Sequence, residues 1–323
     1  MIKIGLFGVG HLGKIHLRLL KEIPQLELVG FFDPNKAIAE KISEEYKVPA
    51  YKNAQELMRK VEAVDIVSPT TTHFELAKQA LSEGKHLFIE KPLCTNSKEG
   101  KILMDLWKST NLVAQVGHVE RFNPAWLAAK DRIGNPKFLE VHRLAMFNPR
   151  GTDVSVVLDL MIHDLDIILS VVPSKVKSVV ATGIPIISDT PDIANARISF
   201  ENGCVANVTA SRLSMKNMRK IRLFQSNAYM SLDFLAKKTE IITLSNENDE
   251  AVTTFPLDLG DKGTRYITFE QPETPPVNAI KEELIQFANS ILNKTKAAVD
   301  MMAGFAALKL AEDINEAIAQ NDV

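Results

Sequence analysis

A glycine-rich turn close to the N-terminus is the feature that most constrains the fold. Gly8-Val9-Gly10-His11-Leu12-Gly13 follows an apolar run, Ile2–Phe7, and precedes residues with apolar side chains at helical spacing. The first glycine permits a tight turn, the second lets the backbone approach a pyrophosphate, and the third permits close packing of helix on strand. The N-terminus of the helix then faces the anion. The sequence therefore predicts a dinucleotide-binding turn, with cofactor contacts from Gly8, Gly10, His11, Leu12 and Gly13.

An acidic residue at the end of the next strand supports this interpretation. Asp33 lies 20 residues after Gly13 and directly follows the predicted strand Leu26–Phe32. A carboxylate at this place accepts hydrogen bonds from an adenosine ribose and repels a 2′-phosphate. We therefore expect NAD as the cofactor, with NADP as the alternative because neighbouring loops can still admit it. The competing interpretation, that the glycines serve only a turn, is disfavoured because strand, helix and acid spacing agree.

Short apolar runs alternate with longer amphipathic ones over the first part of the chain. The predicted strands are 2–7, 26–32, 64–67, 86–89 and 112–116, and the predicted helices are 12–21, 35–46, 73–82 and 97–109. Such alternation with short connections indicates βαβ units, and hence a parallel sheet with helices on both faces. We expect a doubly wound Rossmann domain over residues 1–120, with ligands beyond the carboxyl ends of the strands.

The pattern changes after about residue 135 to short runs rich in Val, Ile, Thr and Phe. The predicted strands here are 176–184, 196–200, 205–210, 219–225, 229–232 and 240–244. Turn signals separate them, and Glu201-Asn202-Gly203 has the composition of a hairpin turn. We expect an α+β domain over residues 121–323 with a large, mostly antiparallel sheet. Its other predicted elements are a helix at 158–171, a loop at 258–276 and helices at 279–292 and 301–319.

Composition excludes several classes of protein. The 38 basic and 40 acidic residues give a net charge of −2, so there is no global basic field to attract nucleic acid or an anionic membrane. No apolar run approaches the ~20 residues of a membrane span, and the N-terminus lacks the pattern of a signal peptide. Two cysteines, Cys94 and Cys204, are too few for a disulfide framework. We therefore expect a cytoplasmic protein.

Two further strand ends carry candidate cofactor contacts. Thr70-Thr71-Thr72-His73 follows the third predicted strand, and we expect Thr70 and His73 on the nicotinamide side; helix capping by the threonines is the alternative. Glu90-Lys91-Pro92 follows the fourth strand. Near a nicotinamide, the Lys91 ammonium can bind a substrate hydroxyl and assist its deprotonation, while Glu90 orients it. A cis Lys91–Pro92 bond is energetically accessible. The alternative is an ordinary solvated charge.

A polar stripe interrupts the apolar helix predicted at 158–171. Asp159, His163 and Asp166 are spaced i, i+4 and i+7, which places them on one helix face. A histidine one turn from a carboxylate is suited to acid–base work. One alternative is a metal site, although Asp-His-Asp without a cysteine cluster is an incomplete set of ligands. The other is that Asp159 caps the helix and that His163 is a core histidine whose hydrogen bonds are satisfied. We expect no metal.

Together these residues resemble a known family. Gly8–Gly13, Asp33, Glu90-Lys91-Pro92 and Asp159-x-x-x-His163-x-x-Asp166 occur in the order and at the separations found in the Gfo/Idh/MocA oxidoreductases. The resemblance covers essentially the whole chain, and the pairing of Glu-Lys-Pro with Asp-x-x-x-His is its specific part. It implies a Rossmann domain followed by an α+β domain whose open sheet face commonly pairs with a second subunit, giving a homodimer or homotetramer.

The resemblance also implies roles for individual residues. Members of the family oxidise a sugar or cyclitol hydroxyl with NAD or NADP, or run the reverse reduction. Lys91 matches the catalytic lysine, His163 the histidine that handles the hydroxyl proton with it, and Asp159 the acid that supports the site. These three residues would also contact the substrate.

A further segment is similar to one subgroup of the family. Residues 115–124, Gln-Val-Gly-His-Val-Glu-Arg-Phe-Asn-Pro, are similar to the stretch found in nucleotide-sugar 3-dehydrogenases, notably those acting on UDP-N-acetylglucosamine. Arg121 is able to clamp a phosphate or carboxylate, and Asn123 to bind a hydroxyl or amide. The alternative is that this segment only starts a helix, with Asn123 as its cap and Pro124 in its first turn.

The sequence thus predicts a dehydrogenase that moves a hydride from a ring carbinol, C3 of a nucleotide sugar, to nicotinamide. The competing substrates are free sugars and inositol-like cyclitols. A non-catalytic NAD-binding scaffold or sensor is the alternative from another class; Lys91 and His163, whose loss would mark such a protein, are both present.

Overall fold

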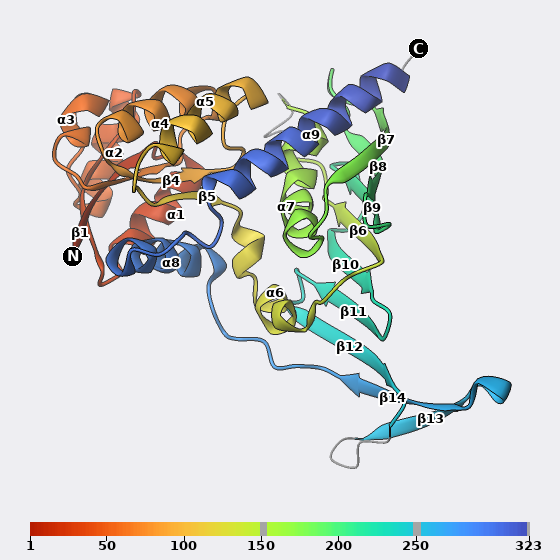
Figure 1. Cartoon of the computed structure of the whole chain (residues 1–323). Coiled ribbons are helices and arrows are strands. Elements are labelled where there is room, and N and C mark those ends of the chain that lie inside the picture. Colours follow the sequence, from red (N-terminus) through yellow and green to blue (C-terminus); the bar gives the residue numbers. More distant parts are fainter. Residues whose placement is uncertain (149–153, 248–252, 322–323) are drawn as a thin grey trace. The chain divides into compact units, whose positions relative to one another are not determined.

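A computed structural model describes residues 1–148, 154–247 and 253–321 of the chain. The chain divides into two compact units (Figure 1). The first consists of Met1–Val119 and Asn278–Lys309, and the second of Glu120–Val277 and Leu310–Val323. These units differ from the predicted ranges 1–120 and 121–323, because residues 278–309 belong with the first unit. The reason is that Leu284, Phe287 and Ala288 are buried in the hydrophobic core of that unit.

The first unit is built on a five-stranded parallel sheet, which confirms the predicted Rossmann fold. Its strands are β1 (Ile2–Phe7), β2 (Leu26–Phe32), β3 (Ala63–Ile66), β4 (His86–Glu90) and β5 (Ala114–Gly117). Their order is β2-β1-β3-β4-β5. The chain passes from β1 to β2 on one side of it, and then crosses to β3 on the other side of β1. In doubly wound sheets such a switch of strand order, here on the two sides of β1, marks the crevice beyond the carboxyl ends of the strands where ligands bind.

Helices cover both faces of this sheet, as expected. In Figure 1, α1 (His11–Leu20) and α8 (Ala279–Asn293) lie on one face, and α4 (His73–Ser82) and α5 (Ser97–Lys108) lie on the other. Two further helices are α2 (Lys36–Tyr46) and α3 (Ala54–Met58). All four strands β1 to β4 are apolar and largely buried, which is typical of a sheet enclosed on both sides.

Asparagine side chains start several of the helices. In each case the side-chain oxygen accepts a hydrogen bond from a backbone N–H of the first turn. These caps are Asn35, Asn53, Asn96, Asn123 and Asn278. Such caps satisfy N–H groups that a helix leaves unpaired, and this fixes where each helix begins after its strand or loop.

The second unit is built on a nine-stranded, mostly antiparallel sheet, which confirms the predicted α+β class. The order is β13-β14-β12-β11-β10-β6-β9-β8-β7, and β6–β9 is its parallel pair. The strands are β6 (Phe138–Leu144), β7 (Val176–Ile184), β8 (Ile193–Phe200), β9 (Val205–Ser211), β10 (Met218–Phe224), β11 (Ala228–Asp233), β12 (Lys238–Ser245), β13 (Thr254–Asp258) and β14 (Thr264–Glu270). The helices α6 (Pro124–Ala129) and α7 (Ile162–Val171) contact one face of the sheet.

Three strands of this sheet, β6, β13 and β14, were not predicted from the sequence. The predicted loop at 258–276 is wrong, because Thr264–Glu270 is strand β14, paired with β12 on one side and β13 on the other. Strand β6 was not predicted either. β13 is the edge strand and is almost wholly exposed, and β14 beside it has no buried residue, so their sequences lack a buried apolar run. The last helix, α9 (Met301–Asn321), agrees with its prediction, and the unit boundary falls within it.

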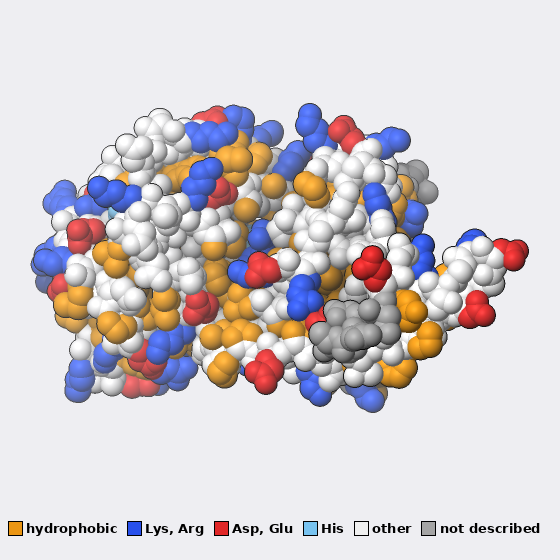
Figure 2. Space-filling view, turned by 60° about the horizontal axis from the view of Figure 1, so that its bottom comes forward, with side chains coloured by type: hydrophobic (Ala, Val, Ile, Leu, Met, Phe, Trp, Pro, Cys, Tyr) orange, Lys and Arg blue, Asp and Glu red, His pale blue; other side chains and the backbone are white. Residues whose placement is uncertain are grey.

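Hydrophobic side chains also gather on the surface of the second unit. In Figure 2 they lie at the base of the projecting β13–β14 ribbon. Phe255 and Phe269 on these strands are 58% and 51% exposed. Cys94 and Cys204 are buried, and neither forms a disulfide. No helix in the described parts of the chain is both long and apolar enough to cross a membrane.

The assignment of α8 to the first unit predicts the effect of a core substitution. Phe287 is fully buried and meets Phe88 of β4 edge-to-face, at 5.8 Å between ring centroids. Phe287→Ala should destabilise the first unit by about 3–5 kcal/mol, because it leaves a cavity. Hydrogen exchange should show this loss at the amides of β1, β3 and β4. The matched control is Phe147→Ala, at an exposed position of the second unit. Unchanged protection of the first-unit strands in Phe287→Ala would contradict the assignment.

Candidate active site

The glycine turn has the shape that a pyrophosphate requires. Gly8 has φ +95°, a conformation that disfavours other residues, and a Cβ on Gly13 would lie 2.1 Å from the Gly8 carbonyl oxygen. Both glycines therefore permit close packing between β1 and α1. Gly10 differs, because a Cβ built on it meets no atom within 4 Å. It faces open space at the N-terminus of α1, where an anion is stabilised.

Asp33 ties this turn to the end of β2. Its Oδ2 accepts a hydrogen bond from the Val9 N–H at 3.0 Å, and its Oδ1 accepts one from the Asn35 N–H at 2.9 Å. The carboxylate thus lies beside the glycine turn, and its side chain is half-buried rather than enclosed. His11 is exposed and Leu12 half-buried in the first turn of α1. The turn and the acid together fit an adenosine dinucleotide.

The threonines after β3 do not cap α4. Thr70–Thr72 forms a single 3₁₀ turn, in which the Thr72 hydroxyl donates to the Pro69 carbonyl oxygen and meets Ser68 Oγ at 2.6 Å. No threonine side chain accepts from the first turn of α4. Thr70 is half-buried at the carboxyl end of β3. It therefore lies where the crevice of the first unit opens.

His73 joins two strand ends instead of facing the crevice. It is 1% exposed, and its ring nitrogens lie 2.9 Å from the carbonyl oxygens of Ser68 and Pro92. Burial lowers the pKa of His73, and the two carbonyl groups partly oppose that effect. This enclosed ring holds the loop after β3 against the loop after β4. It offers no exposed atom to a cofactor, so the predicted contact finds no support here.

Glu90 and Lys91 lie at the carboxyl end of β4. The Glu90 carboxylate is 8% exposed and accepts a hydrogen bond from the Lys91 N–H at 3.2 Å. It lies against β5, where a Cβ on Gly117 would come within 2.8 Å of Glu90 Oε1, so a larger residue there would displace the carboxylate. Lys91 is half-buried, and the Lys91–Pro92 peptide bond is cis.

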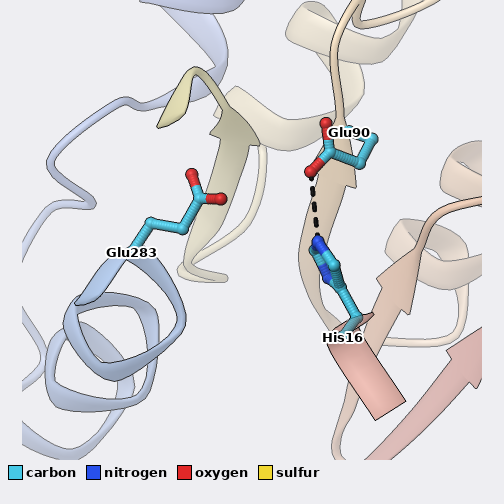
Figure 3. Close-up of side chains that lie close together, drawn as sticks. All are labelled: His16, Glu90 and Glu283. Carbon is cyan, nitrogen blue, oxygen red and sulfur yellow. Dashed lines mark ion pairs between the residues drawn. The ribbon is translucent and has the colours of Figure 1, made fainter. Parts of the chain in front are cut away.

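A buried histidine that was not predicted as a site residue lies behind this strand end. His16 on α1 is completely buried, and its Nδ1 lies 2.9 Å from Asp65 Oδ2. Its Nε2 lies 3.3 Å from Glu90 Oε1 (Figure 3). The sequence did contain a signal, because Asp65 is an acidic residue inside the buried strand β3, and such a residue needs a partner. Its partner, 49 residues earlier in the chain, was not identifiable from spacing.

In the second unit, the predicted polar stripe is divided by a change of helix type. Val157–Met161 forms a π-helical turn, and α7 continues from Ile162. Asp159 lies on the π-turn and His163 in the first turn of α7, and both are half-buried. Single π-turns inside helices are frequent at functional sites. Asp166 pairs with Arg121 instead, and accepts two hydrogen bonds of 2.6 and 3.1 Å from its guanidinium group.

A buried ion-pair network fixes α7 to the sheet of this unit. Arg143 on β6 donates to both oxygens of Asp164, at 2.7 and 2.9 Å, and to Glu120 at 2.9 Å. Burial alone would lower the pKa of Arg143, but the Asp164 and Glu120 carboxylates outweigh it and raise that pKa. The network determines the position of the helix turn that carries His163.

The Arg-Phe-Asn-Pro segment has mainly structural contacts. Asn123 caps α6 and donates to Glu120 Oε2 and to the Phe234 carbonyl oxygen. Its amide is therefore fully used within the protein, in agreement with the capping alternative. Arg121 is partly exposed, and its Nη1 takes no part in the pair with Asp166. The structure thus places Lys91, Asp33 and the glycine turn in the first unit, and Asp159, His163, Arg121 and Asn123 in the second.

Comparison with known proteins identifies the family. An oxidoreductase family model with an NAD-binding Rossmann fold, GFO_IDH_MocA, matches residues 2–118, and the GFO/IDH/MocA C-terminal domain matches residues 127–230. The chain belongs to the GFO/IDH/MocA oxidoreductase family. Its first unit is an NAD-binding Rossmann domain, as the sequence predicted. Members of this family are NAD-dependent dehydrogenases, so the chain is an enzyme of that kind.

Individual relatives match about two thirds of the chain or more. UDP-N-acetylglucosamine 3-dehydrogenase of Acidithiobacillus ferrooxidans is 34% identical over 318 residues, 98% of this chain and 97% of that protein. The crystal structure of that enzyme superposes with a TM-score of 0.88 at 32% identity, covering 99% of this chain and 98% of the other. scyllo-Inositol 2-dehydrogenase (NAD⁺) of Bacillus subtilis is 30% identical over 232 residues, 66% of this chain and 68% of that protein.

The position of Asp33 predicts how a charge change alters cofactor binding. Asp33→Asn keeps the shape of the side chain but removes the charge that favours ribose hydroxyls and repels a 2′-phosphate. NAD should bind about 10-fold more weakly, a loss of roughly 1.4 kcal/mol, while the affinity for NADP should hold or rise. Fluorescence titration with both cofactors measures this. The control is Asp105→Asn on the exposed side of α5. An unchanged NAD/NADP ratio would contradict the role of Asp33.

Proposed function

We propose that this enzyme oxidises the C3 hydroxyl of a nucleotide sugar such as UDP-N-acetylglucosamine, with NAD as the oxidant, in the cytoplasm. The observation that supports this most is the 34% identity to UDP-N-acetylglucosamine 3-dehydrogenase along 98% of the chain. The inositol dehydrogenase is 30% identical over a shorter part, 66% of the chain. A cyclitol or a free sugar is therefore the second candidate class of substrate.

The proposed reaction transfers a hydride and a proton from the carbinol. When bound, nicotinamide supplies the hydride acceptor. Lys91 and His163 accept or relay the hydroxyl proton, so that the products are a 3-keto sugar, NADH and a proton. Asp159 precedes His163 by one helical turn and orients its ring. The rate comes from this proton transfer and from positioning of the C3–H bond.

The glycine turn and Asp33 would hold the dinucleotide. Gly10 leaves open space for the pyrophosphate, and the Asp33 carboxylate lies beside it to bind the adenosine ribose. Thr70, Glu90 and Lys91, at the ends of β3 and β4, would line the nicotinamide end of the same crevice.

Substrate recognition is proposed to depend on Arg121 more than on Asn123. Arg121 is able to donate to a phosphate or carboxylate through its Nη1, while Asp166 fixes the guanidinium in place. Asp166 also neutralises much of its charge, so the contribution of Arg121 is orientation more than attraction. Asn123 holds the start of α6, because its amide is used within the protein.

We also propose a homo-oligomer, dimer or tetramer. The helices of the second unit contact one face of its sheet, and large hydrophobic side chains are exposed on several strands. They include Val180, Ile184, Phe224, Phe255 and Phe269. A second copy of the chain would cover such a surface.

Replacement of Lys91 tests the proposed chemistry. Lys91→Ala should lower kcat at least 10³-fold, because the hydroxyl proton loses its acceptor, and should change the Kd for NAD by less than about 3-fold. Steady-state kinetics and calorimetry measure the two quantities. Lys60→Ala, on a different surface of the first unit, is the control. Retention of full turnover by Lys91→Ala would exclude this role.

A substrate panel separates the candidate functions. NADH formation should be detected with UDP-N-acetylglucosamine, and the ketone of the product should be located at C3 by NMR. Free N-acetylglucosamine, glucose and inositols should react at least about 100-fold less efficiently, because they lack the diphosphate that Arg121 contacts. NADH formation with inositols alone would favour the second class of substrate. Absence of turnover together with tight NAD binding would favour the non-catalytic alternative.

A further inference from the structure

The buried pair of His16 and Glu90 belongs to a larger cluster. Glu283 on α8 directs its carboxyl group toward both side chains (Figure 3), and potential ligand atoms of the three residues lie within 4.8 Å of one another. With Asp65, the cluster contains three carboxylic acids and one imidazole. All four side chains come from the first unit, and they join α1, β3, β4 and α8.

The net charge of this cluster depends on the protons it retains: with His16 protonated and Glu283 neutral, the ionised Asp65 and Glu90 leave a net charge of −1. Among the described residues, His16 is the basic side chain that pairs with these acids. His16, Asp65 and Glu283 are 0% exposed, and Glu90 is 8% exposed. Full ionisation of the three acids would leave two uncompensated negative charges in the core even with His16 protonated, which is strongly unfavourable.

Geometry indicates which groups hold the protons. His16 lies between two carboxylates; burial alone would lower its pKa, but Asp65 and Glu90 together raise that pKa well above the ordinary value. Neither oxygen of Glu283 has a hydrogen-bond partner in the described structure, and the Gln115 amide donates to the Glu283 backbone carbonyl instead. Burial, and then the Glu90 and Asp65 charges, raise the pKa of Glu283 well above its ordinary value.

We propose that His16 and Glu283 are positioning residues of Lys91: a proton on each of them leaves Glu90 as a fixed carboxylate directly before the lysine. Oε2 of Glu90 then accepts a hydrogen bond from the backbone N–H of Lys91 at 3.2 Å, and Oε1 lies 3.3 Å from His16 Nε2 behind it. The carboxylate favours the ammonium form of Lys91 and thereby sets the pH at which the lysine accepts a proton. This inference rests on the proposed role of Lys91 in proton transfer.

The proton on Glu283 is testable without any substrate. The infrared spectrum of the resting wild-type protein at neutral pH should contain the carbonyl stretch of a protonated carboxylic acid, and Glu283→Gln should remove it. Glu44→Gln, at an exposed position of α2, is the control and should leave the band in place. Absence of a band that depends on Glu283 would overturn the proposal.

A metal ion is the competing source of positive charge. His16 Nε2, Glu90 and Glu283 are all able to bind a divalent cation, with Asp65 orienting the histidine from behind. Elemental analysis of the purified protein distinguishes the two cases. We expect no stoichiometric transition metal. A stoichiometric divalent ion that is lost in Glu283→Gln would overturn the proposal, because the cation and not a proton would then offset the negative charge.

The pH profile of turnover tests the link to Lys91. In the direction of oxidation, kcat/KM should rise with pH as the lysine loses its proton. Glu90→Gln should move that limb to lower pH by roughly 0.5–1 unit, because the carboxylate that favours the ammonium is gone. Glu283→Gln replaces one neutral group by another. The rising limb of its kcat/KM profile should therefore move by less than about 0.3 pH unit.

Two results would contradict this part of the proposal. An equal shift in both variants would mean that Glu283 is ionised, and no shift in Glu90→Gln would separate the cluster from Lys91. A failure of the proposed function has a different sign, because Lys91→Ala would then retain turnover. That outcome is independent of the infrared band of Glu283.

Discussion

The close approach of β1 and α1 is the constraint on which the first unit depends. A Cβ on Gly13 would lie 2.1 Å from the Gly8 carbonyl oxygen, so only glycine permits the helix to start this near the strand. That approach sets the position of the first turn of α1 and of its N–H groups at the carboxyl end of the sheet. It also carries His16, one turn further along α1, into the core beside Asp65 and Glu90. One steric requirement thus shapes both the cofactor turn and the position of His16 behind Glu90.

In both units, buried acidic side chains pair with one basic side chain. Each set of pairs holds a segment of backbone in place. In the first unit His16 joins Asp65 to Glu90, and in the second Arg143 joins Asp164 to Glu120. Breaking such a pair by removing one partner is costly, because the other charge stays buried. The pairs therefore restrict the strand end before Lys91 and the helix turn that carries His163. Lys91 and His163, the proposed proton-transfer groups, would require that kind of rigid support.

Most of the fold was predictable because its strands and helices have strong local patterns. The glycine turn, the spacing of Asp33 and the alternation of β1 to β5 specify the Rossmann domain, and the family match confirms it. Strand β14 was not predictable, since none of its side chains is buried and it lacks the buried apolar face that marks an inner strand. The partners of His16 and Asp166 were also hidden, because Asp65 and Arg121 lie 49 and 45 residues away in the sequence. Sequence spacing reports contacts within one helix and does not report such long-range pairs.

Transfer of deuterium from the sugar to the cofactor identifies the carbon that is oxidised. UDP-N-acetylglucosamine labelled with deuterium at C3 is oxidised with NAD, and the isolated NADH is analysed by mass spectrometry and NMR. Hydride transfer from C3 should place one deuterium at C4 of the nicotinamide ring and should be slower than with unlabelled substrate. Unlabelled NADH, with deuterium retained in the sugar, would contradict oxidation at C3.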